Sequence, residues 1–123
     1  MGNVIKIDMK IEIIRGPISK EKLKESAKEM FGDFVKAVVD IEKSIMAIGG
    51  ELHADEERVL LEDGSRQKDV WGINLWIEKD ADDWIEFNSM INVRPSQGNR
   101  TRGIDDNDIK IKIRAIVKQL VLP

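Results

Sequence analysis

A histidine and two acids stand at alternate positions in the short stretch ELHAD: Glu51, His53 and Asp55. If residues 51 to 55 are extended, the three side chains project from one strand face, about 6.5 to 7 Å apart at successive steps. This makes them the candidate catalytic residues, as general acid and base or as ligands of a hard cation such as Mg²⁺ or Mn²⁺. The alternative is a solvated strand face, because any exposed strand in an acidic segment presents polar residues at period two.

A second candidate is the basic stretch INVRPSQGNRTRG, residues 91 to 103, which holds three arginines and no acid. Arginine forks match the oxygens of phosphate or carboxylate, and small loop residues allow backbone amides to complete an anion site. The candidate ligand-binding residues are Arg94, Asn99, Arg100 and Arg102. The stretch has neither the P-loop pattern nor the glycine fingerprint of a dinucleotide site. The alternative is a surface loop whose arginines pair with acids from the segment before it.

The two candidates would form one pocket if their strands were neighbours. Arg94 shares a predicted strand face with Glu86, and that face could adjoin His53. An acid, a histidine and arginines in one pocket are suited to phosphodiester chemistry. The leading hypothesis is therefore a polar pocket for a phosphate-bearing molecule, such as a nucleotide or an RNA end, with hydrolysis as an activity that it could support.

Composition excludes several other kinds of site. The chain of 123 residues has no cysteine, which excludes disulfides, thiolate nucleophiles and cysteine-ligated metals. It has a single histidine, which excludes a multi-histidine metal site within one chain. No metal site is therefore predicted and the sequence requires no cofactor, although Mg²⁺ or Mn²⁺ is conceivable at the acidic stretch.

Charge is unevenly distributed along a chain whose formal net charge is -3. Residues 51 to 90 hold 4 basic and 12 acidic groups, whereas residues 91 to 123 hold 7 and 3. Because the acidic segment would repel phosphates, duplex DNA is not an expected partner. The chain has no membrane-length apolar run and no signal-peptide pattern, so a soluble cytoplasmic protein is expected. Its 18 Ile against 7 Leu are typical of a thermophilic source.

Periodicity predicts the elements of the N-terminal half. Residues 5 to 13 alternate between apolar and charged types, which predicts a half-buried strand. Ser19 is a good N-cap, and apolar residues recur every three or four positions as far as Ile48, which predicts one long helix. Gly32-Asp33 is a point where this helix could kink or split.

The second half reads as strands followed by a helix. Residues 51 to 61 permit a strand and a short helix capped by Asp55, but a strand is favoured because they lead into a turn at Asp63-Gly64. With residues 69 to 77 and 84 to 95 they predict an antiparallel meander. An acidic cap at about Asp105 predicts a final helix. The order β-α-β-β-β-α predicts an α+β fold, a mostly antiparallel sheet with helices packed on one face.

Two further expectations concern domain limits and partners. Residues 9 to 123 are interpreted as a single α+β domain and residues 1 to 8 as an N-terminal extension, because Met9 is an alternative start. Trp71 and Trp76 have opposite strand parity, so at least one of them is expected to point away from the core. With Trp84, they offer an alternative function: a non-enzymatic interaction module that forms a homodimer or docks a protein partner through an exposed tryptophan surface.

Three blocks of the sequence, ELHAD, WGIN and INVRPSQGNR, resemble an uncharacterised family of small archaeal and bacterial proteins, known as a domain of unknown function. The resemblance runs from about Met9 to near the C-terminus. It implies a free-standing domain, and it implies no catalytic role for any residue.

Overall fold

The computed structural model describes residues 10–123, and of residues 81 and 82 it describes the backbone alone. Its helices are α2 (Lys20–Glu29), α3 (His53–Glu62) and α4 (Asn107–Leu120). Its strands are β1 (Glu12–Ile14), β2 (Ile18–Ser19), β3 (Phe34–Asp40), β4 (Ile45–Ile48), β5 (Val70–Trp76), β6 (Ile85–Glu86) and β7 (Val121–Leu122). The predicted extension 1–8 and most of the predicted strand 5–13 lie outside the described residues.

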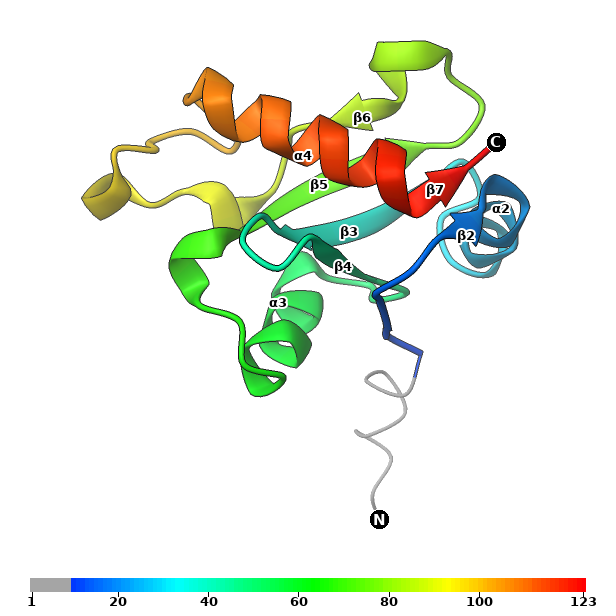
Figure 1. Ribbon diagram of the computed structural model, residues 1–123, viewed down its shortest axis with the longest axis horizontal. Helices are drawn as coiled ribbons and strands as arrows, with labels where there is room; N and C mark the ends of the chain where they lie inside the picture. Colours follow the sequence, from blue (N-terminus) through cyan, green and yellow to red (C-terminus); the bar gives the residue numbers. More distant parts are fainter. Residues whose placement is uncertain (1–9) are drawn as a thin grey trace.

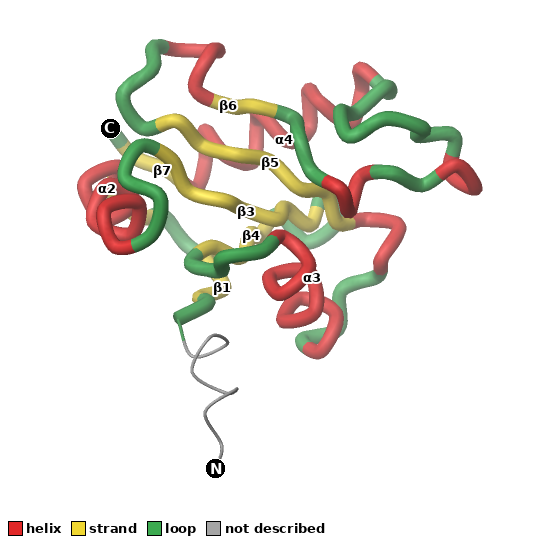
Figure 2. Tube along the Cα trace, turned by 180° about the vertical axis from the view of Figure 1, so that it is seen from behind, coloured by secondary structure: helices red, strands yellow, loops and turns green. Residues whose placement is uncertain are grey.

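Five strands form one antiparallel sheet in the order β1-β4-β3-β5-β6; Figure 1 labels the last four of them, and Figure 2 labels all five. The central strands β3 and β5 pair along their full length, from Phe34 opposite Trp76 to Asp40 opposite Val70. The edge strand β6 reaches β5 only at two positions, and β2 pairs with β7 in a separate parallel sheet. The α+β class and the mostly antiparallel sheet are therefore confirmed.

Helices cover both faces of the sheet, which differs from the predicted single face. The larger core lies between one face and helices α2 and α4, and includes Ala37, Trp71 and Ile113. The smaller core lies under α3 and includes Val38 and Leu60. Figure 2 shows α3 on the side of the sheet opposite to α4. The reason is that β3 and β5 are apolar on both faces over most of their length, so each face needs a covering layer.

The helix predicted up to Ile48 ends after Glu29. Its start is as predicted, because Ser19 Oγ accepts a hydrogen bond from the Lys22 amide at 3.1 Å. The chain then turns at Gly32, whose φ of 87° lies in the left-handed region. Residues 34–48 form β3 and β4 instead. A strand buried on both faces lacks the alternation of apolar and polar residues. Apolar residues three and four positions apart therefore fit two such strands as well as they fit one helix.

The stretch 51–61, predicted as a strand, forms helix α3. Its buried residues are His53, Glu56 and Leu60, which follow helical spacing. Two of these three are polar, so the pattern of apolar residues alone did not show the helix. The acids Asp55 and Glu56 in the first turn suit a helix N-terminus, where the backbone dipole favours negative charge.

The last predicted strand is short and the last predicted helix is confirmed. After β6 the chain continues through two 3-10 turns, Met90–Asn92 and Pro95–Gln97, and a loop that reaches α4. The N-cap of α4 is Asp106, one residue beyond the expected position, and its side chain accepts from the Asp108 amide at 2.8 Å. Within residues 10–123, no helix combines the length and the apolar character that crossing a bilayer requires.

Candidate functional site: a histidine cluster on the α3 face

Helix α3 separates the three residues of the ELHAD stretch. Glu51 precedes the helix and is exposed, whereas His53 is its first residue and is buried. Asp55 is half-buried and its carboxylate lies 3.7 Å from Arg58. Alternate residues of a helix diverge by about 200° around its axis, so the common face expected for a strand does not form. Of the three, His53 is the one whose side chain bonds to the sheet.

His53 is 8% exposed and is fixed against β5. Its Nε2 donates to the carbonyl of Ile73 at 2.8 Å, and because a carbonyl only accepts, the neutral ring must carry its proton on Nε2. Burial lowers the pKa of His53 from 6.5 to about 4. The hydrogen bonds with Ile73 and Asn74 oppose this shift, and the charges of Lys36 and Arg102 add to it. The imidazole is therefore neutral at pH 7, and its Nδ1 keeps a lone pair.

Gly72 allows two side chains to lie directly on β5. A Cβ at this position would stand 3.2 Å from Cδ2 of His53 and 2.6 Å from Oγ of Ser89. Any larger residue would therefore displace the imidazole or the hydroxyl. The position of His53 depends on the absence of a side chain at Gly72.

A row of polar side chains crosses three strands beside His53. Lys36 of β3 lies opposite Asn74 of β5, which in turn lies opposite Glu86 of β6, so all three project from the α3 face. Asn74 Nδ2 donates to Glu86 Oε1 at 3.0 Å. Asn74 Oδ1 is buried, and a hydrogen bond between the Asn74 side chain and His53 raises the pKa of His53. Arg102 acts electrostatically on both His53 and Glu86. We refer to Lys36, His53, Asn74, Glu86 and Arg102 as the histidine cluster.

Three aromatic rings extend the α3 face beyond the cluster. Phe31 stacks on Phe34 with ring centroids 4.7 Å apart, and Phe34 stacks on Trp76 at 4.6 Å. The Nζ atoms of Lys36 and Lys79 lie 5.3 Å and 5.2 Å from the centres of the two outer rings, Phe31 and Trp76. Phe31 is 38% exposed, and the other two rings are half-buried. This aromatic row is flanked by a cation at each end.

The tryptophans differ in their surroundings. Trp71 is buried in the larger core, whereas Trp76 belongs to the aromatic row on the opposite face, so the parity prediction is confirmed. Trp84 is half-buried against the larger core. Trp76 Nε1 donates to Glu86 Oε1 at 3.0 Å, and this hydrogen bond is the main cause that lowers the pKa of Glu86. The aromatic row is therefore bonded to the histidine cluster.

Glu56 is a fully buried acid on the same helix as His53. Its Oε2 accepts from the Gly50 amide at 2.9 Å, and among the described residues its Oε1 has no hydrogen-bond partner. Burial raises the pKa of Glu56 well above 4.5, while the Gly50 amide and the charge of Lys36 oppose the shift. Burial therefore favours the protonated acid beneath the cluster.

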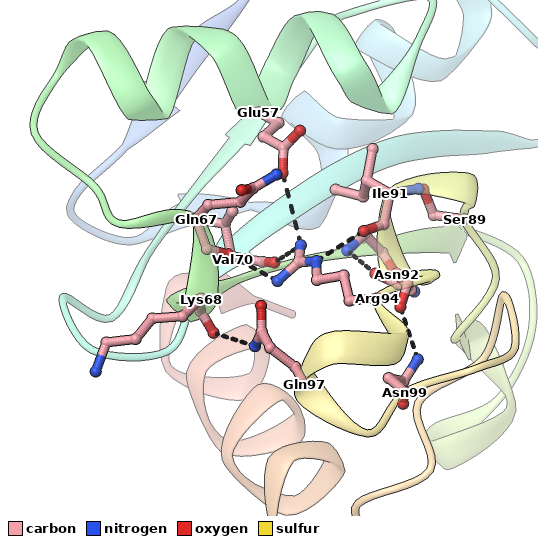
Figure 3. A network of polar contacts seen from close by, with 11 residues as sticks. Glu57, Gln67, Lys68, Val70, Ser89, Ile91, Asn92, Arg94, Gln97 and Asn99 are labelled. Carbon is pink, nitrogen blue, oxygen red and sulfur yellow. Dashed lines mark hydrogen bonds and ion pairs between the residues drawn. The ribbon is translucent and has the colours of Figure 1, made fainter.

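Arg94, a candidate ligand-binding residue, is a buried structural arginine (Figure 3). Its guanidinium donates to three backbone carbonyls, those of Ile91 at 2.9 Å, Gln67 at 2.7 Å and Val70. It also lies 3.5 Å from Glu57 Oε2 and 4.6 Å from the centre of the Trp71 ring. Burial lowers the pKa of Arg94, and the charge of Glu57 opposes the shift. Its donors are directed to the protein's own backbone.

Asn92 and Asn99 hold the basic stretch, residues 91 to 103, against β5; we call this segment the basic loop. Asn92 Oδ1 accepts from the Gly72 amide at 2.8 Å and Nδ2 donates to the Gly72 carbonyl at 3.0 Å, as a paired strand would. Asn99 Oδ1 accepts from the Asp105 amide at 2.8 Å. Asn99 Nδ2 donates to the carbonyls of Asn92, Thr101 and Gly103. These two amides therefore fix the path of the loop.

The loop arginines do not act together. Arg94 faces Glu57, so it meets an acid of the preceding segment. Arg100 and Arg102 are exposed, and Arg102 is the loop arginine whose charge acts on His53. In residues 10–123, no group of three or more histidine, aspartate or glutamate side chains is placed to hold a metal ion.

The comparisons with known proteins place the chain in a family. The model of the family described as "Protein of unknown function (DUF5674)" matches residues 12–120. The chain belongs to this family. No curated protein and no solved structure matches the chain. The resemblance seen in the sequence is therefore confirmed, and it assigns no activity to any residue of the histidine cluster.

Sequence reasoning missed Lys36, Asn74 and the aromatic row. Lys36 and Asn74 are single polar residues inside the apolar runs FVKAVVD and VWGINLW, which form strands buried on both faces. A polar residue inside such a run requires a polar partner or an opening in the covering layer. That interruption was the available signal, but it becomes informative only when both runs are recognised as central strands.

Proposed function

We propose that the α3 face binds a phosphate-bearing nucleotide or the phosphorylated end of a single RNA strand. The observation that carries the proposal is the position of the aromatic row directly beside the histidine cluster on one sheet face. Stacking surfaces and cations in this combination are the features by which proteins bind single-stranded nucleic acid.

Each part of the face has a chemical task in this proposal. Lys36 and Arg102, whose charges both act on His53, supply positive charge for a phosphate. Trp76 supplies a π-surface, on which stacking of one base contributes about 1–3 kcal/mol. The half-buried Glu86 carboxylate is an acceptor suited to the amino group of a base.

Direct titration tests the proposal. A short single-stranded RNA with a terminal phosphate is titrated into the protein and followed by tryptophan fluorescence and by NMR. Lys36→Gln is expected to weaken binding about tenfold, the effect of losing one charge-assisted contact. The matched control is Lys112→Gln, because Lys112 is an exposed cation on α4, on the opposite face of the sheet.

Further ligands sharpen the result. The same RNA without its terminal phosphate is expected to bind more weakly, and duplex DNA is expected to bind more weakly still, because its bases cannot stack on the protein. Equal affinity of Lys36→Gln and Lys112→Gln, or no detectable binding of the phosphorylated RNA, would refute the proposed function.

Hydrolysis is the catalytic extension of this proposal. Water would attack the phosphorus of the terminal phosphate ester, His53 Nδ1 would accept the proton of that water, and the sugar hydroxyl would leave with a proton from solvent. Release of inorganic phosphate that disappears in His53→Asn, with RNA binding retained, is the expected result. Equal release by both proteins would exclude His53 as the base.

A second candidate function is a protein interaction through the same aromatic row, favoured by the 38% exposure of Phe31. A homodimer or a docked partner would cover Phe31 and Trp76. Light scattering at high protein concentration tests the homodimer: a dimer that dissociates in Trp76→Ala supports it. A monomer that Trp76→Ala leaves unchanged contradicts it.

A further inference from the structure

A second feature lies on the other face of the sheet, away from the histidine cluster. A cleft of about 490 Å³ opens between the C-terminal half of α4, β7, the first residue of α2 and the start of β6. Its charged side is formed by Lys20, Arg114 and Lys118, and its apolar side includes Trp84, Ile85 and Leu122. Figure 1 shows α4 leading into β7 beside β2 and α2. We call this feature the cationic cleft.

The three cations of the cleft form no ion pair in the part of the chain that the structure describes. None of the described side chains that line the cleft is acidic, and the lining also includes Pro123 with its terminal carboxyl group. Two of them rest on aromatic rings instead: Lys20 Nζ lies 4.9 Å from the centre of Trp84, and the Arg114 guanidinium lies 5.0 Å from that of Phe87. Like charges that converge on one cavity repel each other, and a bound anion would remove that repulsion.

Arg114 also has a hydrogen-bonding group without a partner. Its Nε is buried, and among the described residues no acceptor lies within hydrogen-bonding distance of it. A guanidinium nitrogen always carries its proton, so this donor is unsatisfied in the absence of a ligand oxygen. A carboxylate or phosphate bound in the cleft would balance the charge of this guanidinium.

The apolar wall restricts the kind of anion. Ile85 belongs to the larger core, and Leu122 is 48% exposed beside the cations. A volume of about 490 Å³ lies within the range of small-molecule sites and exceeds what an inorganic ion would fill. Apolar surface next to fixed charge matches a ligand with one oxyanion head and an apolar body.

We propose that the cationic cleft binds a small molecule in which a carboxylate or a phosphate is carried on an alkyl or aryl body. Lys118 and Arg114 bind the oxygens, Lys20 contributes charge from the opposite side, and Trp84, Ile85 and Leu122 contact the body. The site is separate from the proposed RNA-binding face, since Ile85 and Glu86 project from opposite faces of the two-residue strand β6.

Calorimetry and NMR with four probes test this site: octanoate, octyl phosphate, octanol and inorganic phosphate. The two amphiphilic anions are expected to bind and to shift the Trp84 indole resonance, each at least about tenfold more tightly than octanol or inorganic phosphate. Whichever of octanoate and octyl phosphate binds with the higher affinity identifies the head group that the cleft prefers. Binding of octanol with the affinity of octanoate would overturn the proposal, because charge would then have no part in recognition.

Variants assign the effect to the named cations. Lys118→Gln removes an exposed charge and is expected to weaken octanoate or octyl phosphate about tenfold, whereas Lys112→Gln, an exposed lysine of the same helix outside the cleft, leaves the affinity unchanged. Arg114→Gln is expected to have the larger effect, with circular dichroism to show that it folds; if it does not fold, Lys118→Gln decides alone. Unchanged affinity in Lys118→Gln would overturn the proposal whatever the RNA titration shows.

Discussion

Replacing Gly72 with alanine tests the close approach on which the position of His53 depends. The added Cβ would stand 2.5 Å from Cβ and 2.6 Å from Oγ of Ser89, and 3.2 Å from Cδ2 of His53. Ordinary carbon contacts are about 3.5–4.0 Å, so Ser89 must move by about 1 Å in a packed region where a backbone amide is also hydrogen-bonded. Overpacking of this kind costs about 1–3 kcal/mol. We expect Gly72→Ala to lower the free energy of unfolding by about 2 kcal/mol, which corresponds to a fall in Tm of about 8 °C.

Urea unfolding of four proteins measures this effect: wild type, Gly72→Ala, Ser89→Gly and the double variant. Because Ser89→Gly removes both clashing atoms, the double variant is expected to be more stable than the sum of the single effects by at least about 1 kcal/mol. Gly16→Ala is the control, since among the described residues no heavy atom lies within 4 Å of its added Cβ. The reasoning is refuted if Gly72→Ala is as stable as Gly16→Ala, or if the cycle shows no coupling.

Three further predictions concern buried ionisable groups. The single histidine makes its NMR titration unambiguous, and we expect His53 to titrate near 4 in the folded protein. Since the unfolded chain binds this proton below about 6.5, stability should rise between pH 4 and 6.5 by up to about 3 kcal/mol, and His53→Asn should remove that rise. Glu56 should act in the opposite direction, because its pKa is raised in the folded protein. Its contribution to stability is complete below pH 4.5 and is lost as the pH rises. In urea unfolding, the stability of Glu56→Gln should therefore fall less above pH 4.5 than the stability of the wild-type protein. Arg94→Lys should cost about 3 kcal/mol, because one ammonium cannot reach three carbonyls, whereas Arg100→Lys at an exposed position should cost less than about 0.5 kcal/mol in the same assay.

The elements with complete local signals were predictable from the sequence. Ser19 and the aspartates before α4 begin helices through their own side chains, so these two starts were found to within a residue. The strand at residues 70–76 was also found. The class of the fold followed from these elements, because an α+β arrangement does not depend on the correct assignment of every segment.

The remaining elements depend on contacts made between distant parts of the chain. β3 is a strand because its two faces pack against different helices. An apolar run in the sequence indicates burial, but it does not indicate which elements cover the run. α3 was read as a strand because two of its buried residues, His53 and Glu56, are polar and their bonds to Ile73 and Gly50 are tertiary. His53 is also a residue of the histidine cluster, where polar groups replace the apolar ones that a core pattern leads one to expect.

The candidate site was predictable only in part. His53 was identified as a residue of interest, and its supposed neighbours Glu51 and Asp55 were not retained once the stretch proved helical. Arg94 was selected for its charge, but charge type alone does not distinguish an arginine that binds a ligand from one that binds its own backbone. Burial makes that distinction, and burial of a loop arginine is decided by the whole fold.

The bonds that Asn92 and Arg94 make to β5 have a consequence for folding and solubility. β6 covers β5 only at Asn74 and Leu75, so the backbone groups of Val70 and Gly72 would otherwise form an open sheet edge. Open edges recruit strands from other molecules and so promote aggregation. Two side chains close this edge, which means that a newly made chain remains vulnerable until its basic loop has docked. The loop thus protects the sheet from other copies of the protein, whatever its arginines contribute to binding.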